Sequence, residues 1–229
     1  MEIRILHLLE GAKQAEGLTI VIDVFRAFSV ACYLSHNGAK DILPVGDIKK
    51  AYELKRKFPD YLLVGERNEQ VPEGFDYGNC PTQLLKVDLK GKTVVHTTSA
   101  GTQGLVNATG AAERITGSFV NAPAIIRYIK KQNPNKVSLV CMGYSMKHPT
   151  EEDTFCAEYI KAGLEDKLVD FTQMKEIIKR TSAMRLFATE NQQFSPASDF
   201  DLCMDLGRFN FVLKAEDKDG LLHLTPIKI

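Results

Sequence analysis

Short apolar runs alternating with helix-length stretches constrain the fold of this chain more than any other feature. The clearest run is LTIVIDV at residues 18–24, and runs of this kind are typical of strands buried on both faces of a sheet. A helix is expected from Ala27 to Asn37, where Gly38 stops it. Because the alternation continues along the chain, it predicts βαβ units and an α/β fold, with a mainly parallel sheet between two layers of helices.

The same pattern predicts the other elements. Strands are expected at residues 41–45, 61–64, 93–97, 114–116 and 136–141. Helices are expected at about residues 48–58, 99–108, 122–131, 151–165, 171–187 and 197–206. Pro44 places its strand near an edge, because proline cannot donate a ladder hydrogen bond. Residues 211–215 and 221–225 flank an Asp-Gly turn and predict a C-terminal β-hairpin, which makes the sheet mixed.

Composition excludes several classes of protein. The 229 residues contain no repeat or linker, which predicts a single domain over residues 1–229. Lys plus Arg and Asp plus Glu each total 29, so no basic excess favours a nucleic-acid partner. No apolar run approaches the ~20 residues of a membrane span. Five widely spaced cysteines without a C-x-x-C motif favour reduced thiols in a cytoplasmic protein, and Cys80, with no histidine nearby in sequence, is expected to be inert.

Polar residues follow several of the predicted strands, at the edge where open parallel sheets bind ligands. They are Asp23 and Arg26, Glu66 and Arg67, Thr97 to Thr102, Ser118 and Asn121, and Glu151 to Asp153. Carboxylates suit Mg²⁺, arginines grip phosphate or sulfonate oxygens, and a Thr/Gly turn entering a helix offers N–H groups to an anion. A metal beside an anion clamp predicts phosphoryl transfer or hydrolysis.

Each of these groups also has a structural interpretation. Asp23 interrupts a buried run, and a buried acid costs several kcal/mol unless it is paired, so it is either functional or the partner of Arg26. Glu66 and Arg67 can form a salt bridge within a loop. The residues from Thr97 to Thr102 can cap a helix, and acids suit the first helical turn that Glu151 begins.

Six sequence blocks, kept in one order, make the chain similar to the 2-phosphosulfolactate phosphatase family. The blocks are residues 21–27, 65–67, 73–81, 97–98 with 101–102, 117–122, and 152–153 with 156–157. The resemblance covers about residues 20–160 and implies a three-layer α/β fold. It also implies Mg²⁺-dependent hydrolysis of 2-phospho-3-sulfolactate, a small phosphorylated sulfonate, to sulfolactate and phosphate, which is a step towards coenzyme M or sulfolactate.

The resemblance assigns roles to the matching residues. The expected metal ligands are Asp23, Glu152 and Asp153. Glu66 is either a further ligand or the base that orients the attacking water. The residues expected to hold the acidic end of the substrate are Arg26, Arg67 and Asn79. Those expected to bind the phosphate are Thr97, Thr98 and Thr102.

The sequence departs from the family pattern in four places. Ala100 and Glu69 stand where asparagine and glycine are usual, Glu158 replaces a small residue, and the segment before Glu152 is about one residue longer. These departures motivate a second hypothesis, a non-catalytic protein that binds anionic metabolites. A nucleotide-binding domain is disfavoured, because neither a G-x-G-x-x-G after the first strand nor a Walker lysine loop is present. The apolar C-terminal hairpin can close the sheet or meet a partner chain. A homodimer is expected only by analogy with the family.

Overall fold

The computed structural model describes residues 1–189 and 192–229. Up to the first long loop, its elements are β1 (Glu2–His7), α1 (Leu8–Lys13), β2 (Gly17–Ile22), α2 (Ala27–His36), β3 (Asp41–Pro44), α3 (Ile48–Lys57) and β4 (Leu62–Gly65). The middle of the chain forms β5 (Tyr77–Gly78), α4 (Pro81–Leu84), β6 (Thr93–Thr97), α5 (Gly101–Asn107), β7 (Ala111–Gly117), η1 (Phe119–Asn121), α6 (Ala122–Gln132) and β8 (Lys136–Cys141). The remainder forms α7 (Glu151–Leu164), α8 (Phe171–Arg180), α9 (Met184–Phe187), α10 (Ser198–Cys203), β9 (Phe211–Lys218) and β10 (Leu221–Lys228).

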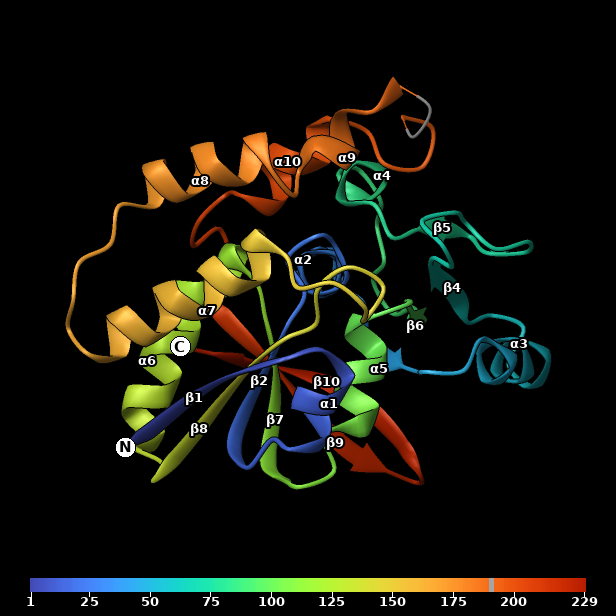
Figure 1. Ribbon diagram of the computed structural model, residues 1–229. Helices are drawn as coiled ribbons and strands as arrows, with labels where there is room; N and C mark the ends of the chain where they lie inside the picture. Colours follow the sequence, from blue (N-terminus) through green and yellow to red (C-terminus); the bar gives the residue numbers. More distant parts are fainter. Residues whose placement is uncertain (190–191) are drawn as a thin grey trace.

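A six-stranded sheet in the order β1-β8-β2-β7-β9-β10 forms the larger part of the molecule (Figure 1). β1, β8, β2 and β7 run parallel, whereas β9 is antiparallel to both β7 and β10. β2 has a strand on each side, and its residues from Leu18 to Ile22 are all buried, as its apolar run predicts. The α/β fold with a mixed, mainly parallel sheet is therefore confirmed.

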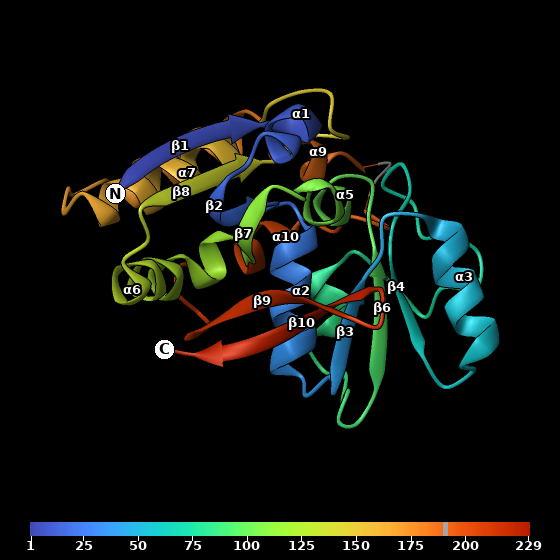
Figure 2. The same cartoon turned by 90° about the horizontal axis from the view of Figure 1, so that it is seen from below.

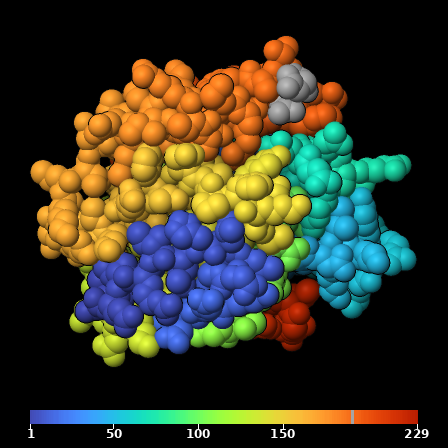
Figure 3. Space-filling view, in the orientation of Figure 1, coloured from blue at the N-terminus to red at the C-terminus, as the bar shows by residue number. Residues whose placement is uncertain are grey.

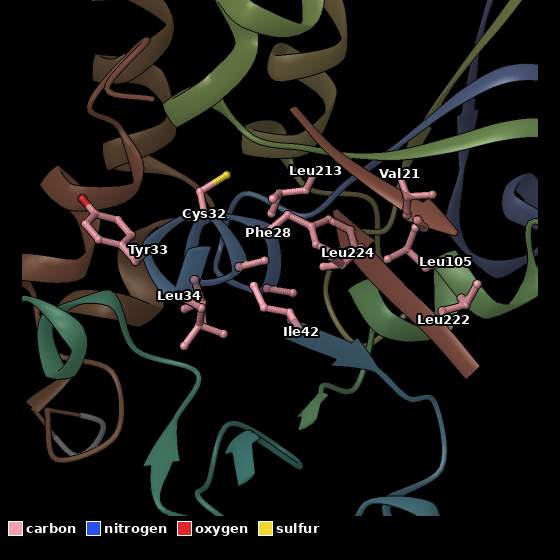
Figure 4. Close-up of a cluster of buried hydrophobic side chains, with 14 of the residues drawn as sticks. Val21, Phe28, Cys32, Tyr33, Leu34, Ile42, Leu105, Leu213, Leu222 and Leu224 are labelled. Carbon is pink, nitrogen blue, oxygen red and sulfur yellow. The ribbon is translucent and has the colours of Figure 1, made fainter. Parts of the chain in front are cut away.

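Helices cover both faces of this sheet. Ile20 and Ile22 of β2 pack in one hydrophobic cluster with α6 and α7. Val21, between them in sequence, packs in another cluster with α2 and α5, because successive strand residues point to opposite faces. Figure 4 shows this second cluster, to which Val21 of β2, Phe28 of α2, Leu105 of α5 and Leu213 of β9 belong.

A second, four-stranded parallel sheet has the order β3-β6-β4-β5. Its two faces are covered differently: Leu63 and Val95 pack against α3, whereas Ile42 and Val64 join the cluster around α2. Figure 2 shows α2 between the two sheets. The strands thus form two sheets, whereas a single mixed sheet was expected. Apolar runs identify strands but do not show which strands pair. The prediction of a single domain stays a prediction.

Local signals in the sequence position several of the elements. The Asp47 side chain caps α3 by accepting from the Lys49 amide, and Pro44 lies in an edge strand as expected. The hairpin turns at Asp219 and Gly220, which both have positive φ. Within the described residues, no helix combines the length and the apolar character that crossing a membrane requires.

Two expectations about elements were incomplete or wrong. β1, α1, β5 and α4 were not predicted. The continuous helix expected over residues 171–187 is broken between α8 and α9. At the break, the Thr181 hydroxyl donates to the Ile177 carbonyl at 2.9 Å, and the Ala183 amide bonds to Ile178 at 3.0 Å. A side-chain hydroxyl that competes for helix carbonyls disfavours regular helix at this position.

Candidate active site

A cavity opens where the carboxyl ends of the two sheets meet. Its lining includes Asp23 after β2, Glu66 after β4, Ser99 after β6 and Gly143 after β8. Arg185 of α9 also lines the cavity, although it lies far beyond the sequence blocks that resemble the family. About 460 Å³ of the cavity is free of protein atoms, including a part open to solvent. Strand ends of both sheets therefore contribute to one site, at the edge where α/β proteins bind ligands.

Asp23 is the acid most strongly affected by its surroundings. Its side chain is 6 % exposed, and Oδ1 accepts a 3.0 Å hydrogen bond from the Ala27 amide at the start of α2. Burial raises the pKa of Asp23 to about 7; the Ala27 amide opposes this shift, and the charges of Glu66 and Glu152 add to it. The environment of Asp23 therefore favours a nearby positive charge.

Glu66 connects two loops at the edge of the cavity. Its Oε1 accepts from the Ser99 amide at 2.6 Å, and its Oε2 accepts from the Ser99 hydroxyl at 2.9 Å and the Glu69 amide at 3.0 Å. These bonds hold the loop after β4 against the loop after β6. Glu66 therefore positions Ser99, whatever further role its carboxylate has.

Glu152 and Asp153 occupy the first turn of α7 but make different contacts. The two Asp153 oxygens accept from the Val24 and Gly143 amides, both at 2.8 Å, and so tie the loops after β2 and β8 to the helix. Glu152 is 2 % exposed, and its Oε1 accepts from Arg185 at 3.0 Å. Its Oε2 is buried with no hydrogen-bond partner among the described residues, and such an atom is costly unless a ligand satisfies it.

Arg185 is a site residue that the sequence analysis missed. Its guanidinium donates to the carbonyls of Ser182 and Phe25 and to Glu152, and its Nε lies 3.5 Å from Glu69 Oε1. Burial lowers the pKa of Arg185, but the charges of Glu152 and Glu69 outweigh burial and raise it above its usual value. In the sequence, Arg185 is one basic residue of an amphipathic stretch, so no linear signal identifies it.

Arg26 lines the cavity, but its ion pair is with Asp199 rather than with Asp23. The Arg26 Nη1 and Asp199 Oδ2 atoms are 2.6 Å apart, and both side chains are buried. Asp199 also accepts from the amide and hydroxyl of Thr82 and from the Cys80 thiol. Burial and the Asp199 charge raise the pKa of Cys80 to about 12, which keeps the thiol protonated and unreactive at neutral pH.

Asn79 also lines the cavity and is nearly buried. Its Oδ1 lies 3.5 Å from Nε2 of His96, a fully buried residue of β6. Burial, with a contribution from the Arg67 charge, lowers the pKa of His96 to about 3, so the imidazole is neutral at physiological pH. A neutral imidazole that donates from Nε2 orients the Asn79 amide towards the cavity.

Four residues expected to bind substrate do not line the cavity. Arg67 donates to the Gly46 carbonyl at 2.8 Å and to the Thr97 hydroxyl at 2.7 Å, and thereby connects the ends of three strand segments. Thr98 and Thr102 bond to each other, with the Thr98 amide 2.9 Å from Thr102 Oγ1. These side chains therefore bond within the protein, although the N-cap residue of α5, Ala100, makes no side-chain cap, and the substrate-binding assignment stays a prediction.

The donor atoms of the site suit a hard divalent cation. Over residues 1–189 and 192–229, no three His, Cys, Asp or Glu side chains form a group that could hold a metal ion. Even so, burial and, to a smaller extent, the charges of Glu66 and Glu152 raise the pKa of Asp23, and Glu152 presents a buried oxygen without a partner among the described residues. Carboxylate oxygens that repel one another fit Mg²⁺, which prefers oxygen ligands and keeps several of its waters, although only Asp23 and Glu66 of these three acids line the cavity.

Comparisons with known proteins identify related sequences. A family model described as 2-phosphosulpholactate phosphatase matches residues 4–218. A relative from Bacillus subtilis, named "Probable 2-phosphosulfolactate phosphatase", is 32% identical over 205 residues, which cover 89% of this chain and 88% of the relative. Relatives with the same name from Caldanaerobacter subterraneus subsp. tengcongensis and Caldicellulosiruptor saccharolyticus are each 43% identical, over 130 and 148 residues. Those two alignments cover 56% and 63% of this chain, and the chain spans only 54% and 61% of those relatives' lengths.

Proposed function

Because the chain belongs to the 2-phosphosulfolactate phosphatase family, we propose that it is a Mg²⁺-dependent phosphatase acting on 2-phospho-3-sulfolactate or a similar small phosphorylated acid. Water cleaves the phosphate ester, and the products are sulfolactate and inorganic phosphate. The observation that carries the proposal is the cavity lined by buried Asp23 and by Arg185, with the buried Glu152, which does not itself line the cavity, paired to Arg185. Hard oxygen donors beside a guanidinium suit a substrate with a metal-bound phosphate and a second anionic group.

Asp23 and Glu152 are the residues that would hold the metal. Bound there, Mg²⁺ would polarise the phosphoryl group and lower the pKa of a coordinated water. Asp153 belongs to the same proposed ligand set, but both of its oxygens already accept backbone hydrogen bonds. We therefore assign it first to holding the loops after β2 and β8 in place around the site.

The remaining side chains bind and orient the substrate. Arg185 pairs with the anionic end, because a guanidinium forms charge-assisted hydrogen bonds to carboxylate, sulfonate or phosphate oxygens. Asn79, oriented by His96, offers its amide to the same ligand. Glu66 fixes Ser99, whose segment also lines the cavity. Arg26, with its charge balanced by Asp199, shapes the wall rather than supplying a second strong cation.

The test is release of inorganic phosphate from 2-phosphosulfolactate, measured with Mg²⁺ and then with excess EDTA. We expect turnover that depends on the metal. The Glu152→Gln variant should lose at least about 10²-fold in rate, since a charge that stabilises the reacting centre is lost. Glu151→Gln changes the neighbouring acid in the same helical turn and should stay within about 3-fold, because Glu151 is partly exposed whereas Glu152 is buried.

The outcomes of this assay separate the two hypotheses. Equal rates for both variants would remove Glu152 from the site. If the folded protein in Mg²⁺ releases no phosphate, the proposal fails for this substrate, and other phosphorylated hydroxy acids come next. If those also fail but an acidic ligand still raises the melting temperature, the anion-binding alternative is the better description.

The cellular location belongs to the same proposal. All five cysteines are free and buried, and thiols of this kind are kept reduced in the cytoplasm. We therefore place the reaction in the cytoplasm. The homodimer expected by analogy with the family stays a prediction.

A further inference from the structure

Glu69 lies in a turn that favours a residue without a side chain. The Arg67 amide bonds to the Gln70 carbonyl at 2.9 Å, and the Gln70 amide returns to Arg67 at 3.1 Å. Asn68 and Glu69 therefore form a two-residue turn, in which their φ values are +52° and +63°. Such turns favour glycine at the second position, because a side chain raises the energy of positive φ. The backbone thus gives no reason for a glutamate at position 69.

The Glu69 side chain reaches across the mouth of the cavity. Its Oε1 lies 3.5 Å from Nε of Arg185, and its Oε2 accepts from the Tyr144 hydroxyl at 3.4 Å. In the space-filling view, the yellow segment near residue 145 lies against the teal segment that follows residue 65, below the orange segment that contains α9 (Figure 3). The contacts of Glu69 therefore join three segments that are distant in sequence.

Glu152 and Glu69, two acids that contact Arg185, differ in how easily an incoming ligand can replace them. Glu152 is 2 % exposed and lies 3.0 Å from the guanidinium, whereas Glu69 is 29 % exposed and lies 3.5 Å away. The longer and more exposed ion pair is the weaker one, because water screens it and competes for its partners. An anionic group that enters the cavity would therefore replace Glu69 rather than Glu152.

We propose that Glu69 is a specificity-determining residue that competes with the anionic end of the ligand for Arg185. The inference rests on the proposed function, in which Arg185 binds that anionic end. A ligand with a second anionic group must displace the Glu69 carboxylate, whereas a ligand without one leaves the pair intact. Return of the carboxylate to Arg185 weakens binding of the anionic organic product and so accelerates its release.

The test compares two ligands by isothermal titration calorimetry at saturating Mg²⁺. Sulfolactate carries the second anionic group, and lactate lacks it. Glu69→Gln removes the charge while keeping the size of the side chain and the strain of the turn. We expect this variant to bind sulfolactate about 3–10-fold more tightly, as expected for a partly exposed ion pair, and to change lactate binding less than about 2-fold. Glu73→Gln, an exposed acid of the same loop, should leave both affinities within about 2-fold.

Two further variants separate the effect of the Glu69 charge on binding from the effect of the strained turn on stability. Glu69→Gly removes the carboxylate and also the strain, so it should tighten sulfolactate binding and raise the melting temperature. In an Arg185→Gln background, Glu69→Gln should no longer change the affinity, because the two residues act through one contact. The comparison of the two ligands in the single variants does not depend on this double variant.

Several results would overturn the inference. They are unchanged or weaker sulfolactate binding by Glu69→Gln, equal tightening of both ligands, and no sulfolactate binding by any variant. The inference survives if Glu69→Gln tightens sulfolactate binding while phosphate release is absent, and in that case only the proposed function fails. Normal phosphate release with an unchanged sulfolactate affinity would overturn the inference and leave the proposed function intact.

Discussion

At the scale of single residues, the role proposed for Asp23 sets stability against function. A buried carboxylate whose pKa is raised to about 7 destabilises the folded state when it is ionised. Natural proteins keep such groups where the chemistry needs them, and a neutral isostere often stabilises the fold while abolishing activity. Replacing Asp23 by its neutral isostere asparagine therefore tests the site through both activity and stability.

Asp23→Asn should lower the rate of phosphate release at least about 10²-fold, because a charge next to the reacting centre is lost. In EDTA the variant should melt at a higher temperature than the wild type, since a neutral amide is easier to bury beside Glu66 and Glu152. Phosphate release and differential scanning calorimetry measure the two effects. Asp60→Asn, in an exposed position, is the control for both. Full activity in Asp23→Asn would exclude Asp23 from the site.

A second prediction for a single residue concerns His96 and the loss of protein stability at acidic pH. Its pKa is about 3 in the folded protein because of burial, against an ordinary value of 6.5. Below pH 6.5 the unfolded chain binds a proton that the folded chain does not, so stability falls as the pH drops from 6.5 towards 3. The contribution of neutral, buried His96 to the free energy of unfolding is fully present above pH 6.5. Below that pH, the free energy of unfolding falls by up to about 1.4 kcal/mol per pH unit.

The His96→Leu variant should therefore lose less stability than the wild type between pH 6.5 and pH 4. Urea unfolding at several pH values gives this difference directly, and taking the difference cancels the titration of groups that both proteins share. His148→Gln, at an exposed histidine, should keep the slope of the wild type. Parallel curves for His96→Leu and wild type would show that His96 is not the group responsible.

At the scale of elements, the end of β4 sets the position of the site. Gly65 has a φ of +148°, and a Cβ atom there would lie 1.9 Å from the Thr97 carbonyl oxygen of the neighbouring strand β6. Only glycine lets these strands approach so closely just before Glu66. The β4–β6 pairing and the Glu66–Ser99 bonds therefore depend on one missing side chain.

Gly65→Ala should destabilise the protein by about 2–3 kcal/mol, because the added methyl group must push the two strands apart. Gly74→Ala is the matched control, since Gly74 also has positive φ but no atom lies within 4 Å of the added Cβ. That control should cost only about 1 kcal/mol, from the backbone strain alone. Urea unfolding measures both changes, and equal losses would contradict the role of close strand approach.

Local sequence predicted the interior elements better than the edge of the sheet. Buried strands such as β2 are continuous apolar runs, whereas β1 alternates Glu2 and Arg4 with apolar residues and forms an edge strand that stays half-exposed. Asp23 could be placed at a strand end because it follows such a run. Arg185 could not be placed, because its contacts with the site arise only from tertiary packing of a short helix.

At the scale of the whole molecule, the site draws opposite charges from different parts of the chain. Its acids follow strands of both sheets or begin α7, whereas Arg185 comes from the C-terminal third. Two ion pairs, Arg26–Asp199 and Arg185–Glu152, fasten that C-terminal segment over the cavity. A ligand that binds the acids therefore acts on contacts that hold both sheets and the C-terminal segment together.

This arrangement predicts that Mg²⁺ stabilises the whole fold. A cation that binds only the folded state adds about 2.7 kcal/mol at a concentration 100 times its dissociation constant, which for a chain of this length raises the melting temperature by about 5–10 °C. Calorimetry with Mg²⁺, against NaCl of equal ionic strength, measures the shift and removes the effect of general screening. The shift should largely disappear in Glu152→Gln and persist in Glu151→Gln. Equal melting temperatures in Mg²⁺ and NaCl for the wild type would contradict a metal site among these acids, because repulsion between Asp23 and its neighbours would then remain unrelieved.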